Sequence, residues 1–222
     1  QHVSVARFYP EGTIISSGLS KWCGAGGWRL GTFTFPRGLN WLLDSMAVVA
    51  SETYTSTSAP IQHAAVRAFK GGTDIEEYLH QARRILRRLG RYGYLRLTRA
   101  GALVPEPKGG FYLFPNFSPF RKSLADRGIK TGTQLCETLL DEAGVAVLPG
   151  SAFGRPAKEL SFRMAYVDFD GARALVAARH GGGRAELNAA FLRNYCHNAV
   201  KGVDRIVVWL QKSGLSPEKR KG

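Results

Sequence analysis

An amphipathic repeat in the middle of the chain constrains the fold more than any other sequence feature. Between residues 75 and 89 of the 222-residue sequence, apolar side chains recur at helical spacing. The members of this stripe are Ile75, Tyr78, Leu79, Ala82, Ile85, Leu86 and Leu89. The spacing predicts a helix with one buried face, and Thr73 is well placed to cap its start. Because that face needs a cover, other elements must pack against this helix.

Short β-prone stretches alternate with helical stretches on both sides of this helix. We expect strands at 13–17, 28–35, 102–104, 111–114, 145–148 and 160–167. We expect further helices at 39–50, 60–70 and 131–143, another from 171, and a last one at 187–206. The first two strands are expected to be buried. This alternation predicts an α/β or α+β protein whose domain boundary falls within or just after the long helix, giving domains 1–88 and 89–222.

The charge balance is strongly basic. The 31 Lys and Arg residues exceed the 17 Asp and Glu residues by 14, a balance typical of nucleic-acid-binding proteins. Seven arginines lie between residues 83 and 99, where there is no acidic residue: Arg83, Arg84, Arg87, Arg88, Arg91, Arg96 and Arg99. A charged run opposite an apolar stripe is usually a solvated helix face. We therefore rank a basic nucleic-acid-binding module below an enzyme, and we expect the short basic tail at 219–221 to be disordered.

The cysteine and histidine residues give no metal or disulfide pattern. Three cysteines at wide spacing fit a reducing compartment, and the histidines lack ligand spacing, so we predict no metal. The sequence has no apolar run of the roughly 20 residues that a membrane helix needs, and no signal-peptide layout. These observations predict a cytoplasmic protein without a membrane partner.

The densest chemistry lies at residues 16–31. Lys21 follows an expected buried strand among small residues, where desolvation favours the neutral amine that forms a Schiff base. Eight residues later, Arg29 offers a planar set of donors for a phosphate, while Ser17 and Ser20 offer hydroxyls and Gly18 a backbone amide. The alternative is a glycine-rich loop with a solvated lysine. A nucleophilic amine next to a phosphate-binding group is what pyridoxal 5′-phosphate requires.

Residues 18–31 resemble the lysine signature of class I aminotransferases, with each specified position met. The resemblance implies that Lys21 is the catalytic lysine and binds pyridoxal 5′-phosphate together with Arg29, Ser20 and Gly18. Aspartate aminotransferases carry a serine where this chain has Gly18, so the serine contact to phosphate falls to Ser20 or Ser17. No third glycine completes a dinucleotide fingerprint, and no P-loop is present.

The resemblance continues to about residue 179. The segments that carry it, in the order of the family, are 57–62, 109–115, 145–154 and 162–166. It assigns Arg163 to the α-carboxylate of the substrate. Because its neighbours in the strand are apolar, Arg163 is expected to need a buried anionic partner, and a bidentate carboxylate suits it. A structural salt bridge is the alternative.

The family likeness implies an α/β fold. Residues 1–88 would form part of the large domain of pyridoxal-phosphate transferases of fold type I, and 89–222 would form the smaller α+β domain. It implies a homodimer that exchanges an amino group between an amino acid and a 2-oxo acid. A lyase, decarboxylase or synthase on the same scaffold is the alternative.

Several family residues have no counterpart in this sequence. The aspartate that pairs with the pyridine nitrogen and its neighbouring tyrosine and asparagine precede the lysine strand in the family, and none can be matched here. Without that carboxylate the pyridine ring is a weaker electron sink. We therefore expect a fragment that is a poor catalyst alone. An inactive partner subunit is a further alternative.

Overall fold

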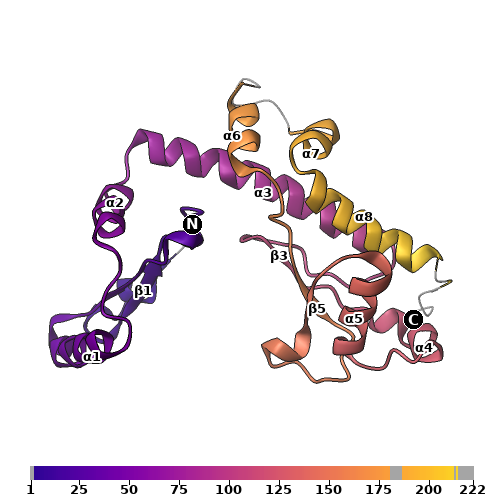
Figure 1. Cartoon of the computed structure of the whole chain (residues 1–222), viewed down its shortest axis with the longest axis horizontal. Coiled ribbons are helices and arrows are strands. Elements are labelled where there is room, and N and C mark those ends of the chain that lie inside the picture. The colour runs from indigo at the N-terminus through magenta and orange to yellow at the C-terminus, as the bar shows by residue number, and fades with distance from the viewer. Residues whose placement is uncertain (1–2, 181–186, 213, 215–222) are drawn as a thin grey trace. The chain divides into compact units, whose positions relative to one another are not determined.

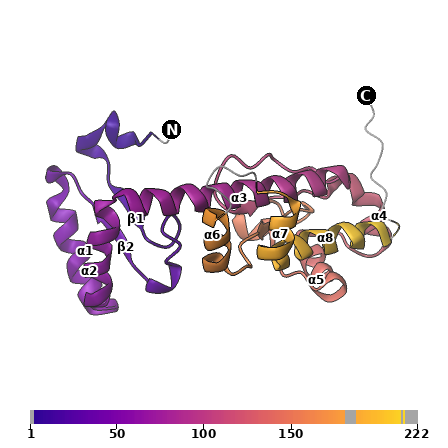
Figure 2. The same ribbon diagram turned by 90° about the horizontal axis from the view of Figure 1, so that it is seen from above.

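The computed structural model describes residues 3–180, 187–212 and 214, and the chain divides into two compact units, Gln1–Leu79 and His80–Gly222. The division falls inside α3 (Thr73–Arg99), the long helix that Figure 2 shows as one continuous rod. The expected boundary at residues 88 and 89 falls in the same helix, and the assignment of the two parts as large and small domains stays a prediction. The basic tail at 219–221 lies outside the described residues.

The first unit is a two-stranded antiparallel sheet with helices after it (Figure 1). Its elements are β1 (Ile15–Gly18), β2 (Gly31–Thr34), α1 (Asn40–Thr53) and α2 (Ala59–Lys70), with 3-10 turns at Val5–Arg7, Pro10–Gly12, Gly26–Trp28 and Arg37–Leu39. In the strand pair Ile15 faces Thr34 and Gly18 faces Gly31. This register places the residues between 18 and 31 in one loop at the end of the sheet.

Two expectations about the first unit are wrong. β1 and β2 are shorter than predicted, because residues 26–28 form a 3-10 turn, and both strands are largely exposed instead of buried. Ile15 is 39% exposed and Phe33 is 56% exposed. The described residues of this unit bury apolar side chains at the loop end of the sheet, against α2, and leave the faces of the strands uncovered.

The second unit combines a three-stranded antiparallel sheet, in the order β3-β5-β4, with helices. Its strands are β3 (Tyr112–Leu113), β4 (Leu148–Pro149) and β5 (Phe162–Ala165). Its helices after α3 are α4 (Arg121–Asp126), α5 (Gly132–Ala143), α6 (Gly171–His180), α7 (Ala189–Tyr195) and α8 (His197–Lys212), with 3-10 turns at Ser118–Phe120 and Gly150–Phe153. The alternation of strands and helices predicted from the sequence is confirmed.

Local signals set several of these ends. The side chain of Thr131 accepts a hydrogen bond from the Gln134 amide and forms a capping box, and Gly144 ends α5 in the left-handed conformation, as predicted. The strand expected at 102–104 is only a bridge between Leu103 and Asn116, because the prolines that follow cannot donate to a ladder. The last helix divides at Cys196 into α7 and α8.

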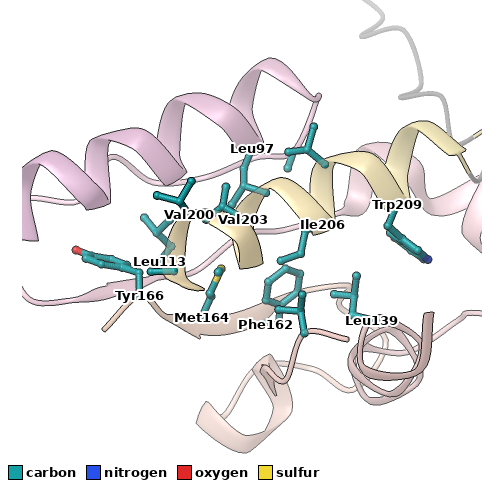
Figure 3. Close-up of a cluster of buried hydrophobic side chains, with 14 of the residues drawn as sticks. Leu97, Leu113, Leu139, Phe162, Met164, Tyr166, Val200, Val203, Ile206 and Trp209 are labelled. Carbon is teal, nitrogen blue, oxygen red and sulfur yellow. The ribbon is translucent and has the colours of Figure 1, made fainter. Parts of the chain in front are cut away.

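The core of the second unit lies between the sheet and the helices. Leu113, Phe162 and Met164 point from one face of the sheet, and Val203 and Ile206 of α8 meet them (Figure 3). Each of these five side chains is at most 4% exposed. In β5 the alternate residues therefore face away from this core, which determines where Arg163 points.

Candidate active site

The lysine loop connects β1 to β2 and is closed by its own backbone. The Leu19 amide donates to the carbonyl of Leu30 at 3.3 Å, and the Ala25 amide donates to the carbonyl of Leu19 at 3.1 Å. Lys21 thus lies in a closed turn directly after the strand. A Cβ on Gly18 would lie 2.8 Å from the Leu30 oxygen, so a larger residue here would force the two strands of this chain to shift.

Apolar contacts hold the two ends of this loop against α2. Leu19 is fully buried and Leu30 is 6% exposed, and both pack in one cluster with Ala65. The Trp22 ring, next to the lysine, lies 5.6 Å from the Phe69 ring. These anchors fix the backbone on both sides of position 21.

A tyrosine of α3 supplies a further anchor. The Tyr78 hydroxyl donates to the carbonyl of Cys23 at 2.9 Å, and burial raises the pKa of this tyrosine, with the nearby Cys23 as the second cause. A hydroxyl that stays protonated remains a donor. The sequence assigned Tyr78 to the apolar stripe, and no local signal indicated its bond to the lysine loop.

Arg29 ends the 3-10 turn of the loop in the left-handed conformation, with φ of 54°. Its Nη1 donates to the carbonyl of Gly26 at 2.9 Å, and no described carboxylate forms an ion pair with it. No acidic residue occurs between Glu11 and Asp44. The loop therefore carries Lys21 and Arg29 without a carboxylate of its own, a composition that suits an anionic ligand.

The structure brings together the residues predicted to bind the cofactor, since Gly18, Ser20, Lys21 and Arg29 share one closed loop. The expectation that burial desolvates the lysine is wrong for this chain, because Lys21 is exposed. The buried cluster of this unit takes up Leu19 and Leu30 and leaves Lys21 exposed. The roles of the four residues stay predictions.

Arg163 lies in β5 on the face of the sheet opposite the core. It is half-buried, and its Cζ lies 4.4 Å from the centroid of the Tyr112 ring and 4.2 Å from that of the Phe153 ring. No ion pair with a described residue involves it. The structural salt bridge considered from the sequence is thus not seen among the described residues, and aromatic rings take the place of the expected anionic partner.

Sequence reasoning missed the roles of Tyr112 and Phe153. Both belong to segments that resemble the aminotransferases, but no spacing rule relates them to Arg163. Arg163 and Lys21 belong to different units, each described by itself. Their pairing in one active site therefore stays a prediction.

The arginine cluster of α3 is partly structural. Arg96 Nε lies 2.8 Å from Oδ1 of Asp204 in α8, and the Tyr92 hydroxyl donates to the same carboxylate. Burial, followed by this carboxylate, raises the pKa of Tyr92 to about 12. Arg88 donates to the carbonyl of Leu187. These bonds tie α3 to later elements of the second unit, so part of the basic run stabilises the fold.

Four members of the cluster are exposed to solvent, as a solvated helix face predicts. They are Arg83, Arg87, Arg91 and Arg99. Among the residues that the structure describes, no helix is long and apolar enough to cross a membrane. No group of three or more His, Cys, Asp or Glu within the described ranges could hold a metal ion.

Curated relatives of the chain are aminotransferases. An aspartate aminotransferase of Geobacillus stearothermophilus is 34% identical over 159 residues, which cover 70% of this chain and 38% of the relative. The asparagine–oxo-acid transaminase of Streptococcus mutans is 33% identical over 68% of this chain and 39% of its own length. The chain thus spans less than half the length of these relatives.

Solved structures agree with the sequence matches. An aromatic aminotransferase from Pyrococcus horikoshii matches with a TM-score of 0.71 and 27% identity, over 97% of this chain and 48% of that one. Aspartate aminotransferase from Thermus thermophilus matches with a TM-score of 0.68 and 25% identity, over 94% and 44%. The fold is therefore part of the fold type I aminotransferase fold. The family model of aminotransferase class I and II matches residues 3–178, and the chain belongs to this family of pyridoxal-phosphate enzymes.

Proposed function

We propose that this protein transfers an amino group between an amino acid and a 2-oxo acid with pyridoxal 5′-phosphate as cofactor. The observation that carries the proposal is the closed, acid-free loop that holds Lys21 and Arg29. Family membership and the transaminase names of the relatives support the same reaction. They support a transaminase over the lyase, decarboxylase and synthase alternatives.

The residues of the loop fit the cofactor chemically. An aldehyde needs an amine, which Lys21 supplies, and a phosphate needs cationic and hydroxyl donors, which Arg29, Ser20 and Ser17 supply. The Leu19 amide donates across the strand pair to the Leu30 carbonyl, so by the alternation of an antiparallel ladder the Gly18 amide faces away from β2. We assign the phosphate contact to Arg29 and Ser20, with the Gly18 amide as a further donor.

Each residue has a distinct task in the proposed reaction. The cofactor, when bound, supplies the electron sink that stabilises negative charge at the substrate Cα. Lys21 would hold the cofactor at its aldehyde carbon, and its amine would accept the proton that leaves the substrate Cα. Arg29 neutralises the phosphate. Arg163 binds the α-carboxylate through its paired N–H donors and so orients the Cα–H bond.

We also propose that the protein is a homodimer, as the family likeness implies. Helix α1 supports this, because it buries no residue and exposes large apolar side chains: Trp41 is 64% exposed and Val48 is 65% exposed. Apolar residues in such a row are typical of interfaces. Sedimentation at several concentrations tests this, and a monomer at every concentration contradicts it.

Absorption spectroscopy with added pyridoxal 5′-phosphate tests the cofactor site. The chain should develop a visible absorption band, and Lys21→Ala should lose it. Borohydride reduction and peptide mapping should place the label on Lys21. A label distributed over several other lysines would contradict the proposed role of this residue.

The role of Arg29 in phosphate binding can be tested against a matched control variant. Arg29→Gln should weaken pyridoxal-phosphate binding about tenfold, the range expected for a charge-assisted pair. Arg37→Gln removes the same charge from the same unit and should have little effect. With pyridoxal, which has no phosphate, the two variants should behave alike. Equal losses of pyridoxal-phosphate affinity in both variants would contradict a specific role for Arg29.

A further inference from the structure

The antiparallel register of β3 and β5 places Tyr112 and Arg163 on the same face of the sheet. Tyr112 is paired with Ala165, two residues along β5 from Arg163, so the two side chains are diagonal neighbours. Phe162 and Met164 point to the opposite, buried face. The sheet therefore presents the arginine next to an aromatic ring, away from the core.

The second ring comes from the turn after β4. Leu148 of β4 is paired with Arg163, and the 3-10 turn that follows this strand ends at Phe153. The Phe153 ring is 40% exposed and is supported on its side by Phe114, whose ring centroid lies 6.1 Å away in an edge-to-face arrangement. Two segments, β3 and the turn after β4, thus place an aromatic ring beside the guanidinium that β5 carries.

We propose that Tyr112 and Phe153 are positioning residues that hold the Arg163 guanidinium as a ready receptor for the substrate carboxylate, an inference that rests on the role of Arg163 in the proposed function. An aromatic face attracts a guanidinium through its charge and leaves the N–H donors unoccupied. An acidic partner would hold the side chain equally well but would occupy those donors and cancel the charge. No described acidic residue pairs with Arg163.

This arrangement explains how a half-buried arginine is held without an ion pair. A long side chain with several rotatable bonds loses conformational entropy when it binds a ligand, and holding it in advance removes part of that cost. The rings therefore act on affinity through Arg163, without contacting the reacting atoms. Their removal should weaken carboxylate binding while the sheet stays folded.

A titration of the full chain with propionate, followed by NMR at the Nε–H signal of Arg163, tests the proposal. Arg163→Lys identifies the signal by its loss. Tyr112→Leu and Phe153→Leu should each raise the dissociation constant for propionate about fivefold, as expected for loss of one cation–π contact. Tyr112→Phe and Phe153→Tyr keep a ring and should stay within about twofold of the unmodified chain.

Controls separate positioning from folding and from simple salt effects. Tyr195→Leu removes a ring that lies 5.8 Å from Arg173, another arginine of the same unit, and should leave propionate binding unchanged. Chloride at equal ionic strength should not shift the Arg163 signal. Circular dichroism checks the fold of each variant. If Tyr112→Leu unfolds, the Phe153→Leu and Phe153→Tyr variants still test the positioning role, because the Phe153 ring is partly exposed.

The outcomes distinguish this proposal from the proposed function. If propionate shifts Arg163 but the leucine variants bind it as well as the unmodified chain, the positioning role is overturned and the carboxylate role of Arg163 stands. If propionate does not shift the Arg163 signal at all, both the positioning role of the rings and the carboxylate role of Arg163 are overturned. Pyridoxal-phosphate binding at Lys21 is decided separately, by its own assay.

Discussion

Two glycines occupy the first position of two helices in the second unit and differ in their surroundings. Gly132 begins α5, and a Cβ there would lie 2.8 Å from the carbonyl oxygen of Glu159 and 3.1 Å from that of Ser161. Gly171 begins α6, and a Cβ there would meet nothing within 4 Å. At residue scale, packing decides whether a glycine is required, because the secondary structure is the same at both sites.

Alanine substitutions test this difference. Gly132→Ala should destabilise the protein by about 1–3 kcal/mol, because the contacts are with backbone that cannot move aside easily. Gly171→Ala should be neutral or stabilise by about 0.4–1 kcal/mol, since alanine restricts the unfolded chain. Urea unfolding of both variants provides the measurement. Equal stabilities would contradict the close approach at Gly132.

At the scale of elements, one carboxylate connects three segments of the second unit. Glu142 of α5 accepts hydrogen bonds at 2.7 Å from Arg127, which follows α4, and from the Trp209 indole of α8. The Arg127 guanidinium, and secondarily the indole, hold the pKa of Glu142 below its ordinary value of 4.5. The side chains of Arg127 and Glu142 are 30% and 44% exposed, so water screens the pair.

This pair predicts a pH-dependent contribution to stability. A carboxyl with a lowered pKa in the folded state stabilises the protein above its unfolded pKa and loses that contribution as pH falls through the folded value. Glu142→Gln should therefore lower the thermal midpoint at pH 7. The corresponding loss in free energy of unfolding should be less than about 1 kcal/mol. The difference from the unmodified chain should shrink as pH falls below 4.5.

The control for this prediction lies on the same helix. Glu137 is exposed and forms no ion pair with a described residue, so Glu137→Gln should leave the thermal midpoint nearly unchanged across the pH range. A Glu142→Gln midpoint that differs from the unmodified one equally at pH 3 and pH 7 would contradict the ionic origin of the effect.

At the scale of the whole molecule, the two units differ in how much apolar surface they bury. In the described part of the first unit, the buried cluster consists of Leu19, Leu30 and Ala65. In the second unit, a continuous cluster runs from Ile85 in α3 to Leu210 in α8. Because burial of apolar surface is the main source of stability, the second unit should resist local opening far better.

Hydrogen exchange measured by mass spectrometry tests this expectation. Peptides that cover β1 and β2 should exchange at least about a hundredfold faster than peptides that cover β5. β5 is the central strand of its sheet, and one of its faces is buried in the core. Bound pyridoxal phosphate should slow exchange in the lysine loop. Equal protection of the two sheets in the chain alone would show that the first unit is stabilised by more than its small cluster.

Much of the local structure and part of the site could be predicted from the sequence. The ends of α5 follow from Thr131 and Gly144, and the long helix follows from its apolar stripe. The lysine loop was recognised from the residue types at 18–31. The exposure of Lys21 could not be predicted, because burial depends on which elements cover a strand, and alternation of apolar residues does not report that.

Sequence alone therefore determined the order of the elements, the two ends of α5 and the set of residues in the lysine loop, because these depend on neighbours a few positions apart. The predicted cap Thr73 is instead the first residue of α3. Tertiary structure alone decided that Tyr78 anchors the loop, that Asp204 pairs with Arg96, and that aromatic rings surround Arg163. The physical reason is that such contacts join segments distant in the chain, and strand register and helix packing select which side chains meet.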